Sequence, residues 1–330
     1  LKMSALLGVG VALAPAALTS CRKEEGLNVT FTGKVLIIGA GAAGMIAAYT
    51  CAQNGIDFEI IEAHSDYGGR VQRNTSLSDY PIDIGAEWLH TEPRVFGQMI
   101  KDDNVNGSVE LISYQPETLY NYNNGSLNSQ NWASHFYGEY KFKKTTWYHF
   151  FETYIVPSIQ AKMVLNAPVT DIDASGAQVV VTTTDSTQYT SDKVIVTVPM
   201  KILQQETINF APALPTAKKS AIDSIHIPPG LKVFIEFSEK FYPDILVLGP
   251  LLAGSGDKIY YDAGFKKDTN KNILALFWVG DGANEFTDLN DADILSRMLT
   301  ELDEIFEGKA TPAYRNHVIQ NWSAQPFVQG

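Results

Sequence analysis

The sequence has little cysteine and a shortage of positive charge. Only two of its 330 residues are cysteines, Cys21 and Cys51, so one disulfide at most could form and we expect none. Lys and Arg number 25 against 37 Asp and Glu, which gives a formal net charge of −12. Because phosphate binding needs clustered Lys and Arg, this balance predicts no nucleic-acid partner.

Long hydrophobic runs are also scarce, and the clearest one lies at the N-terminus. Residues 3–18 are almost all apolar or small, which is short for a membrane span but typical of a signal peptide. The stretch LTSC, residues 18–21, resembles the lipobox of bacterial lipoproteins, and LKMSALLG resembles the end of a twin-arginine leader. We therefore expect residues 1–32 to be the leader and tether of an exported bacterial lipoprotein, periplasmic or at the cell surface, held to the membrane through Cys21. A frayed apolar helix is the alternative.

A glycine-rich junction between a strand and a helix is the feature that points to chemistry. The stretch KVLIIGAGAAGMIAAY, residues 34–49, leads through aliphatic residues into Gly39, Gly41 and Gly44. The first glycine permits a tight turn, the second lets the backbone approach a pyrophosphate, and the third lets helix and strand pack closely. The helix N-terminus then offers N–H groups and a positive dipole end to the phosphates. A glycine-rich turn without a ligand is the alternative.

A second strand and an acidic residue extend this junction. We predict strands over 33–39 and 58–63 with a helix over 42–54 between them, which is a βαβ unit. Glu62 closes the second strand, where a carboxylate accepts the hydroxyls of a ribose. The pattern predicts a dinucleotide-binding domain and leaves NAD and FAD open.

The next motif favours FAD. EAHSDYGGRV, residues 62–71, resembles the Glu-Ala-x-x-x-x-Gly-Gly-Arg signature of flavin-dependent amine oxidases. Two glycines let the chain approach an anion, and the arginine adds a planar charged donor. In the family this turn passes the FAD diphosphate with its arginine, here Arg70, facing the cofactor. Taken alone, the stretch could be a surface turn with a solvated arginine.

Later segments resemble the same family in the same order, over roughly residues 33–330. They are DIGAEWLH (83–90), NAPVTDI (166–172), VIVTVPMKIL (194–203), GLKVFIEFSEKFY (230–242) and NWSAQPFVQG (321–330).

The resemblance implies roles for individual residues. Lys232 matches the family lysine that holds a water against flavin N5, although a lysine at this place could also protect the edge of a sheet. Trp322 would lie near the flavin, and His90 would be a polar group on the substrate side. The residues implied at FAD are Gly39, Gly41, Ala43, Gly44, Glu62, Ala63, Gly69, Arg70, Gly85, Ala86, Glu87, Trp88, Val169 and Trp322.

The implied fold class is α/β. A Rossmann-like, doubly wound FAD-binding domain would be interleaved with an α+β substrate domain. We expect the FAD-binding domain over 33–90, 166–199 and 311–330, and the substrate domain over 91–165 and 200–310. The pattern of residues 167–199 predicts a β-meander followed by one buried aliphatic strand, KVIVTVP, and 291–308 form the clearest amphipathic helix.

The chain departs from the family pattern in several places. It starts without Met and ends at Gly330, where the family continues, so we expect a chain truncated at both ends that binds FAD poorly. Gln325 replaces the usual acid of the last motif. The segment between His90 and Asn166 is short, and its aromatic residues either line an open substrate pocket or belong to the core. These residues are Tyr114, Tyr120, Trp132, Trp147 and Tyr148.

The activity implied by the resemblance is oxidation of an amine to an imine, with hydride transfer to flavin N5 and reoxidation by O2 to H2O2. A polyamine or monoamine is favoured over an amino acid, since Arg94 is the single candidate for binding a carboxylate. The alternatives are a carotenoid desaturase or protoporphyrinogen oxidase of the same fold, a non-catalytic exported flavoprotein, and an NAD dehydrogenase.

Overall fold

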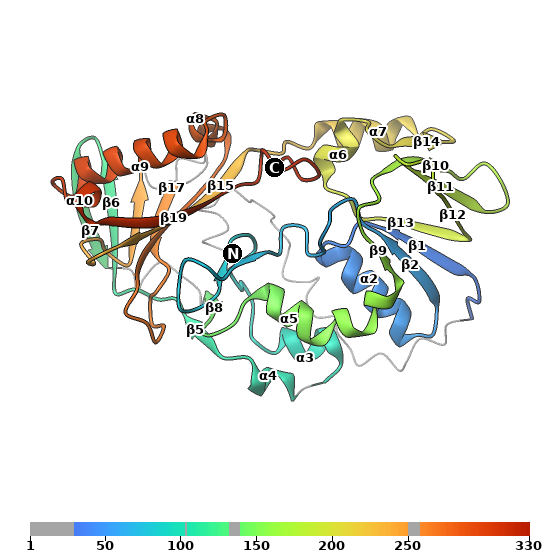
Figure 1. Cartoon of the computed structure of the whole chain (residues 1–330), viewed down its shortest axis with the longest axis horizontal. Helices are drawn as coiled ribbons and strands as arrows, with labels where there is room; N and C mark the ends of the chain where they lie inside the picture. Colours follow the sequence, from blue (N-terminus) through green and yellow to red (C-terminus); the bar gives the residue numbers. More distant parts are fainter. Residues whose placement is uncertain (1–29, 103, 132–138, 250–257) are drawn as a thin grey trace.

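The structure is a computed structural model that describes residues 30–102, 104–131, 139–249 and 258–330. It is elongated, with one large β-sheet in each half and the last residue, Gly330, between the halves (Figure 1). Residues 1–29 of the predicted leader and tether, including Cys21, lie outside the described residues. Among the described residues, no helix has both the length and the apolar character that crossing a bilayer requires.

The first half is built on a parallel four-stranded sheet in the order β13-β1-β2-β9. Helix α2 (Ala42–Gln53) joins the central strands as a crossover, so the predicted βαβ unit is confirmed. The aliphatic side chains of the first strand are buried on both faces, as expected for a covered parallel sheet. The strands are β1 (Lys34–Ile38), β2 (Asp57–Ile61), β9 (Met163–Val164) and β13 (Lys193–Val196).

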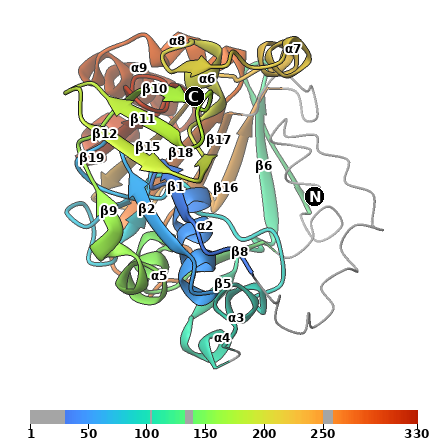
Figure 2. The same cartoon turned by 90° about the vertical axis from the view of Figure 1, so that its right-hand side faces the viewer.

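A second sheet covers the face of this sheet that lies opposite α2 (Figure 2). Its order is β12-β11-β10-β14, and Ile172 and Val181 pack against Leu36 and Ile61 of the parallel sheet. The expected β-meander is therefore present, as β10 (Val169–Asp173), β11 (Val179–Thr183) and β12 (Gln188–Ser191). The aliphatic strand expected after it is β13, but that strand is partly exposed rather than buried. The chain continues through α6 (Met200–Gln204), β14 (Asn209–Ala211) and α7 (Thr216–Ser224).

Short helices and strands pack beside α2 on the other face of the parallel sheet. Phe150 and Ile155 share one core with Ile37 and Met45, although residues 91–165 were expected to belong to the substrate domain. Thr146 starts α5 by accepting a hydrogen bond from the His149 N–H at 3.1 Å. The elements here are α3 (Val95–Ile100), α4 (Val105–Ser108), β5 (Leu111–Ser113), β8 (Tyr140–Phe142), α5 (Trp147–Tyr154), η3 (Val156–Ser158) and η4 (Gln160–Lys162).

The second half is a seven-stranded sheet in the order β19-β15-β18-β17-β16-β6-β7. Its outer face packs on the predicted amphipathic helix, α9, through Ile294, Met298 and Leu302 (Figure 1). Its strands are β6 (Thr118–Asn123), β7 (Ser126–Asn131), β15 (Gly230–Phe237), β16 (Ile245–Leu248), β17 (Lys258–Asp262), β18 (Asn272–Val279) and β19 (Tyr314–Asn321). The helices here are η5 (Asp281–Ala283), α8 (Asn284–Thr287), α9 (Asp291–Ile305) and α10 (Ala310–Ala313).

The domain expected for residues 311–330 differs from the half of the molecule whose sheet contains most of them. Residues 311–330 were expected in the FAD-binding domain, but β19 pairs antiparallel with β15 as the edge strand of the seven-stranded sheet. The turn after β19 then returns toward the first half. After the Gly-Gly-Arg turn, the chain forms the short antiparallel pair β3 (Arg73–Asn74) and β4 (Ile82–Asp83).

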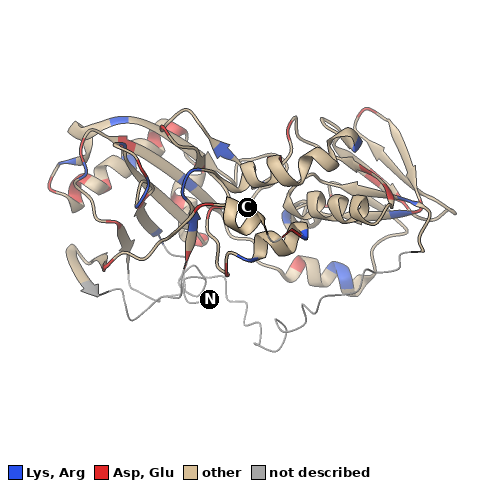
Figure 3. Cartoon of the chain, turned by 90° about the horizontal axis from the view of Figure 1, so that it is seen from below, with Lys and Arg blue, Asp and Glu red and all other residues tan. Residues whose placement is uncertain are grey.

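Charge is mixed over the surface. Figure 3 shows Lys and Arg interspersed with Asp and Glu in both halves. Cys51 is buried on α2 as a free thiol, and burial raises its pKa.

Candidate functional site

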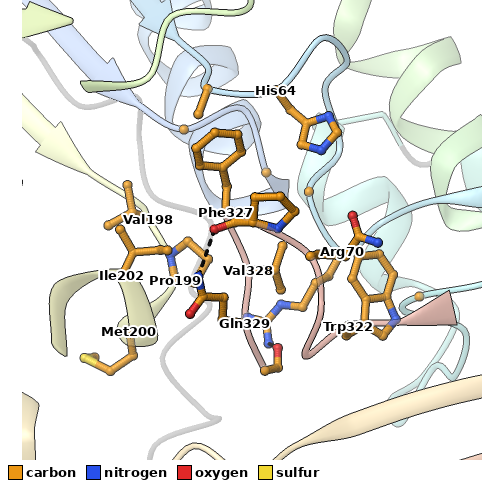
Figure 4. Close-up of a pocket in the computed structure, with 18 of the residues that line it drawn as sticks. His64, Arg70, Val198, Pro199, Met200, Ile202, Trp322, Phe327, Val328 and Gln329 are labelled. Carbon is orange, nitrogen blue, oxygen red and sulfur yellow. Dashed lines mark hydrogen bonds between the residues drawn. The ribbon is translucent and has the colours of Figure 1, made fainter. Parts of the chain in front are cut away.

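A cavity of about 1550 Å³ lies where the two halves meet. It is larger than the ~300–1,000 Å³ of ordinary small-molecule sites, so it suits an extended ligand. The glycine turn and Glu62 line one end, and Lys232 and Phe277 of the seven-stranded sheet line the other. In Figure 4 the side chains of Val198 and Ile202 face those of Arg70 and Trp322 across it.

The glycine turn has the geometry that a diphosphate needs. Gly39 has a φ of 102°, which favours glycine, and its N–H donates to the Ile61 carbonyl at 2.8 Å. A Cβ on Gly44 would lie 1.9 Å from the Gly39 carbonyl oxygen, so this glycine is required for the helix to approach the strand. A Cβ on Gly41 would meet nothing within 4 Å, because this position faces the open cavity. Gly41 is also the N-cap of α2 and brings no side-chain cap, which leaves the helix N-terminus available to an anion.

Glu62 is held rigidly beside this turn. Its Oε2 accepts the Ala40 N–H at 2.5 Å and its Oε1 accepts the His64 N–H at 2.8 Å. A carboxylate oxygen can accept more than one hydrogen bond, so both oxygens keep capacity toward the cavity. The arrangement suits the hydroxyls of a ribose.

The Gly-Gly-Arg turn lies against the glycine turn. Gly68 donates its N–H to the Ala40 carbonyl at 2.8 Å and forms a parallel bridge with Gly41. Gly68 and Gly69 have φ values of 106° and 58°. The exposed Arg70 guanidinium lies in the cavity and donates to the Gly330 carbonyl at 3.2 Å. Two backbone turns and one permanent cation therefore converge where a diphosphate would bind.

Gly85 lets the loop after β4 approach both the Gly-Gly-Arg turn and Trp322. A Cβ there would lie 1.8 Å from the Arg70 carbonyl oxygen and 3.0 Å from the Trp322 ring. The Trp322 indole N–H donates to the Ile84 carbonyl at 3.1 Å, which fixes the ring at the cavity wall. Residues 325–330 follow Trp322 and turn back through the cavity, so that Phe327 and Val328 point among its side chains (Figure 4).

Lys232 lies in the wall at this end with only 3% of its surface exposed. Its Nζ is 2.5 Å from Glu87 Oε2 and 3.4 Å from the Asp83 carbonyl oxygen. Glu87 Oε1 lies 2.6 Å from the Nζ of Lys141, and the Tyr261 hydroxyl also donates to Glu87. One buried carboxylate thus serves two buried ammonium groups.

Burial and these charges shift several pKa values. Burial lowers the pKa of Lys232, while the Glu87 carboxylate opposes this effect. Burial alone would raise the pKa of Glu87, but Lys141 and Lys232 outweigh it and bring the pKa to about 2. Burial and then Glu87 raise the pKa of Asp83 well above its ordinary value. Burial lowers the pKa of nearby Lys267 to about 8, and Lys141 adds to that effect.

Most of the residues singled out in the sequence line this cavity. They are Gly39, Gly41, Ala43, Glu62, Ala63, Gly69, Arg70, Gly85, Ala86, Val169, Lys232 and Trp322. Gly44 lies behind the turn as a packing residue.

Glu87, Trp88 and His90 are placed differently from the expectation. The Glu87 and Trp88 side chains belong to the buried cluster around Lys141, behind the cavity wall. The Nδ1 of His90 lies 2.5 Å from Glu139 Oε2, and neither residue lines the cavity.

Lys141 and Tyr261 belong to the site but carry no signal in the sequence. Both lie in strands as ordinary lysine and tyrosine residues, and no local spacing relates them to Lys232. Among the expected aromatic residues, Tyr114 and Tyr148 are buried and none of the described ones lines the cavity, while Trp132 lies outside the described residues.

Comparison with known proteins gives the family. Residues 155–330 match the family described as "Flavin containing amine oxidoreductase", and residues 37–102 match the "NAD(P)-binding Rossmann-like domain". The first match covers more than half of the chain and includes Lys232 and Trp322. The second begins in β1 and includes the glycine turn.

Individual relatives agree with this result. The chain is 32% identical over 174 residues to human "Lysine-specific histone demethylase 2", which covers 50% of this chain and 21% of that protein. It is 29% identical over 166 residues to "Polyamine oxidase 4" of Oryza sativa subsp. japonica, covering 50% and 34%. It is 27% identical over 175 residues to "Polyamine oxidase 1" of Zea mays, covering 52% and 35%. The matched region thus spans between about a fifth and about a third of each of these relatives.

The cavity fits the cofactor that this family uses. An open Gly41 position, an uncapped helix N-terminus, a fixed carboxylate and an arginine suit the dinucleotide part of FAD. The cavity then continues to Lys232 and Trp322, where the flavin part would extend. The chain belongs to the flavin-containing amine oxidoreductase family, whose cofactor is FAD.

Proposed function

We propose that this chain is the FAD-binding and catalytic region of an oxidase that converts an amine to an imine, with O2 as the final acceptor and H2O2 as a product. The observation that carries the proposal is that Lys232 and the glycine turn line one continuous cavity. These residues come from sheets in different halves of the molecule. Their convergence supports a site in which cofactor and substrate meet.

FAD, when bound, supplies the acceptor for a hydride from the carbon next to the amine nitrogen. The chain's part is to bind, orient and exclude water. Gly41, Glu62 and Arg70 would hold the dinucleotide, and the anchored ring of Trp322 would form part of the wall at the reacting end. The buried ammonium of Lys232 would hold a water or a polar substrate atom at that wall.

The proposed substrate is a polyamine or a monoamine. Two of the named relatives are called polyamine oxidases and a third is called a lysine-specific histone demethylase. At the substrate end the cavity wall includes the apolar residues Phe277 and Val279, which suit an alkyl chain. Asp281 lies at the same end and could attract a second ammonium group.

A visible spectrum tests this proposal directly. The protein is purified with FAD, and the flavin absorbance is recorded before and after separate anaerobic additions of a polyamine, a monoamine, an amino acid, a polyene and a porphyrinogen. Loss of absorbance with the first two, followed by peroxide release in air, supports the proposal. Bound flavin that no amine bleaches would instead support a non-catalytic flavoprotein, and bleaching by a polyene or a porphyrinogen would point to the other enzymes of this fold.

We also propose that the mature protein is exported and lipid-anchored at Cys21. The support is the apolar run of residues 3–18 followed by LTSC, and these residues lie outside the described part of the structure. Membrane fractionation of the full-length protein and a Cys21→Ser variant tests the anchor. A variant that stays in the membrane fraction as fully as the parent would contradict it.

A further inference from the structure

The cluster behind the cavity wall contains more charged groups than a simple ion pair. Four side chains meet there from separate segments: Glu87 follows β4, Lys141 lies on β8, Lys232 on β15 and Tyr261 on β17. The charged side chains are 3–4% exposed. Of the four, Lys232 lines the cavity and the other three do not.

Glu87 uses both of its oxygens in this cluster. Oε1 binds Lys141 at 2.6 Å, and Oε2 binds Lys232 at 2.5 Å and also accepts the Tyr261 hydroxyl. A carboxylate bound on both sides cannot rotate without breaking a charged hydrogen bond. The position of the Lys232 ammonium is therefore fixed through Glu87.

Three aromatic rings surround the ammonium group of Lys141. Its Nζ lies 4.9 Å from the ring centre of Trp88, 5.2 Å from that of Tyr114 and 4.7 Å from that of Tyr261. Three aromatic faces stabilise a desolvated cation by cation–π attraction. Lys141 is therefore held by three aromatic rings as well as by the carboxylate that it shares with Lys232.

We propose that Glu87 is a positioning residue for Lys232, and that Lys141, in its aromatic cage, balances Glu87 from the far side. Two cations share one carboxylate, so the cluster keeps a net positive charge. Glu87 fixes where the Lys232 ammonium lies and favours its charged form, while Lys141 opposes that form. The catalytic meaning of this role rests on the proposed function, since it concerns the lysine expected at the reacting end.

Two other titratable residues, Asp83 and Lys267, lie near the cluster. Asp83 presents its backbone carbonyl to the lysine, and its carboxyl is buried and accepts the Trp147 N–H at 3.0 Å. Lys267 donates to the carbonyls of Phe142 and Lys143 at 2.8 and 3.2 Å. Neither approaches Lys232 as closely as Glu87 does, so Glu87 is the group whose removal should matter most.

Competitive labelling of lysines tests the role without any substrate. The purified full chain is treated with limiting acetic anhydride across a pH series, and mass spectrometry of the peptide containing Lys232 gives its titration midpoint. In Glu87→Gln the midpoint should fall by about 1–3 pH units, because an opposite charge that favours the ammonium is lost. In Lys141→Met it should rise, because a like charge that disfavours the ammonium is lost. Opposite shifts cannot come from a general loosening of the fold.

The matched control is Glu301→Gln. Glu301 binds another buried lysine, Lys258, at 2.5 Å on the opposite face of the same sheet. This variant should lower the midpoint of Lys258 and leave that of Lys232 unchanged. An unchanged Lys232 midpoint in Glu87→Gln, or shifts of the same sign in Glu87→Gln and Lys141→Met, would overturn the proposal.

A charge-matched variant covers the case in which Glu87→Gln does not fold. Glu87→Gln/Lys141→Met removes one charge of each sign and keeps the net charge of the cluster. Its Lys232 midpoint should still fall, since Glu87 contacts Lys232 directly and Lys141 does not; a midpoint at or above that of the parent contradicts the proposal. If the midpoints shift as expected while no amine bleaches the flavin, the proposed function fails and the positioning role of Glu87 stands.

Discussion

Two clusters of lysine, glutamate and tyrosine lie on opposite faces of the seven-stranded sheet. Each cluster contains one of two neighbouring tyrosines of β17. Tyr260 points toward α9, and Tyr261 points toward the other half of the molecule. On the α9 face, Glu301 binds Lys258 and accepts the Tyr260 hydroxyl, each at 2.5 Å. On the opposite face, Glu87 binds Lys232 and accepts the Tyr261 hydroxyl.

The two clusters differ in solvation and in charge balance. Glu301 keeps 27% of its side chain exposed and Lys258 keeps 10%, whereas Glu87 and Lys232 keep 4% and 3%. Lys258 also lies 4.2 Å from the ring centre of Trp278, so both faces use aromatic rings to hold a cation. The cluster under α9 pairs one cation with one partly solvated carboxylate, as a structural ion pair would. The cluster at the cavity wall is dry and holds one cation in excess.

The largest difference should appear when each carboxylate is neutralised. Glu87→Gln leaves two buried ammonium groups without a counter-ion, so the free energy of unfolding should fall by about 3–5 kcal/mol. Glu301→Gln leaves one lysine beside a site that water can reach, and the loss should be about 1 kcal/mol. Urea unfolding of both variants measures the two losses. Equal losses would show that the clusters are energetically equivalent and would remove the distinction between them.

Acid pH should next remove the difference in stability between the parent and Glu87→Gln. The folded pKa of Glu87, about 2, lies below its ordinary value of 4.5, so its stabilisation is complete above pH 4.5 and disappears as the pH falls toward 2. This corresponds to about 3 kcal/mol of the difference between the parent and Glu87→Gln. Urea unfolding at several pH values should show the two curves converging between pH 4.5 and pH 2. Curves that remain parallel over this interval would mean that the Glu87 carboxylate is not the group responsible.

The sequence was sufficient for the parts of the site that local geometry determines. The glycine turn, Glu62 and Arg70 lie within one βαβ unit and the turn after it, where chain direction follows from a few residues. Lys232 was found by its place in a motif, since a lysine inside an apolar strand is unusual. These residues all line the cavity.

The sequence was insufficient where distant strands meet. Glu87 and Lys232 are 145 residues apart, and Glu87 and Tyr261 are 174 apart, so their contacts depend on how the loop after β4 packs against the sheet. Alternation along a strand shows that Lys141 and Tyr261 each share a face with their second neighbours, but not which other segment that face meets. The same limit applies to β19, whose antiparallel pairing with β15 joins residues far apart in the sequence.

The smallest change in the free energy of unfolding should come from removing the hydroxyl of either neighbouring tyrosine. This is also the most closely matched pair of variants. Tyr261→Phe removes a hydrogen bond to a dry carboxylate and should lower the free energy of unfolding by about 1.5–3 kcal/mol. Tyr260→Phe makes the same chemical change one residue away, but water can replace the lost donor at the partly exposed Glu301, so the loss should be about 1 kcal/mol or less. Because burial raises both tyrosine pKa values, both hydroxyls are neutral donors at neutral pH. Urea unfolding at pH 7 compares the two variants. A larger loss for Tyr260→Phe would reverse the assignment of the drier, more tightly coupled cluster, whereas the expected order would confirm that the face toward the cavity is the one that cannot draw on solvent.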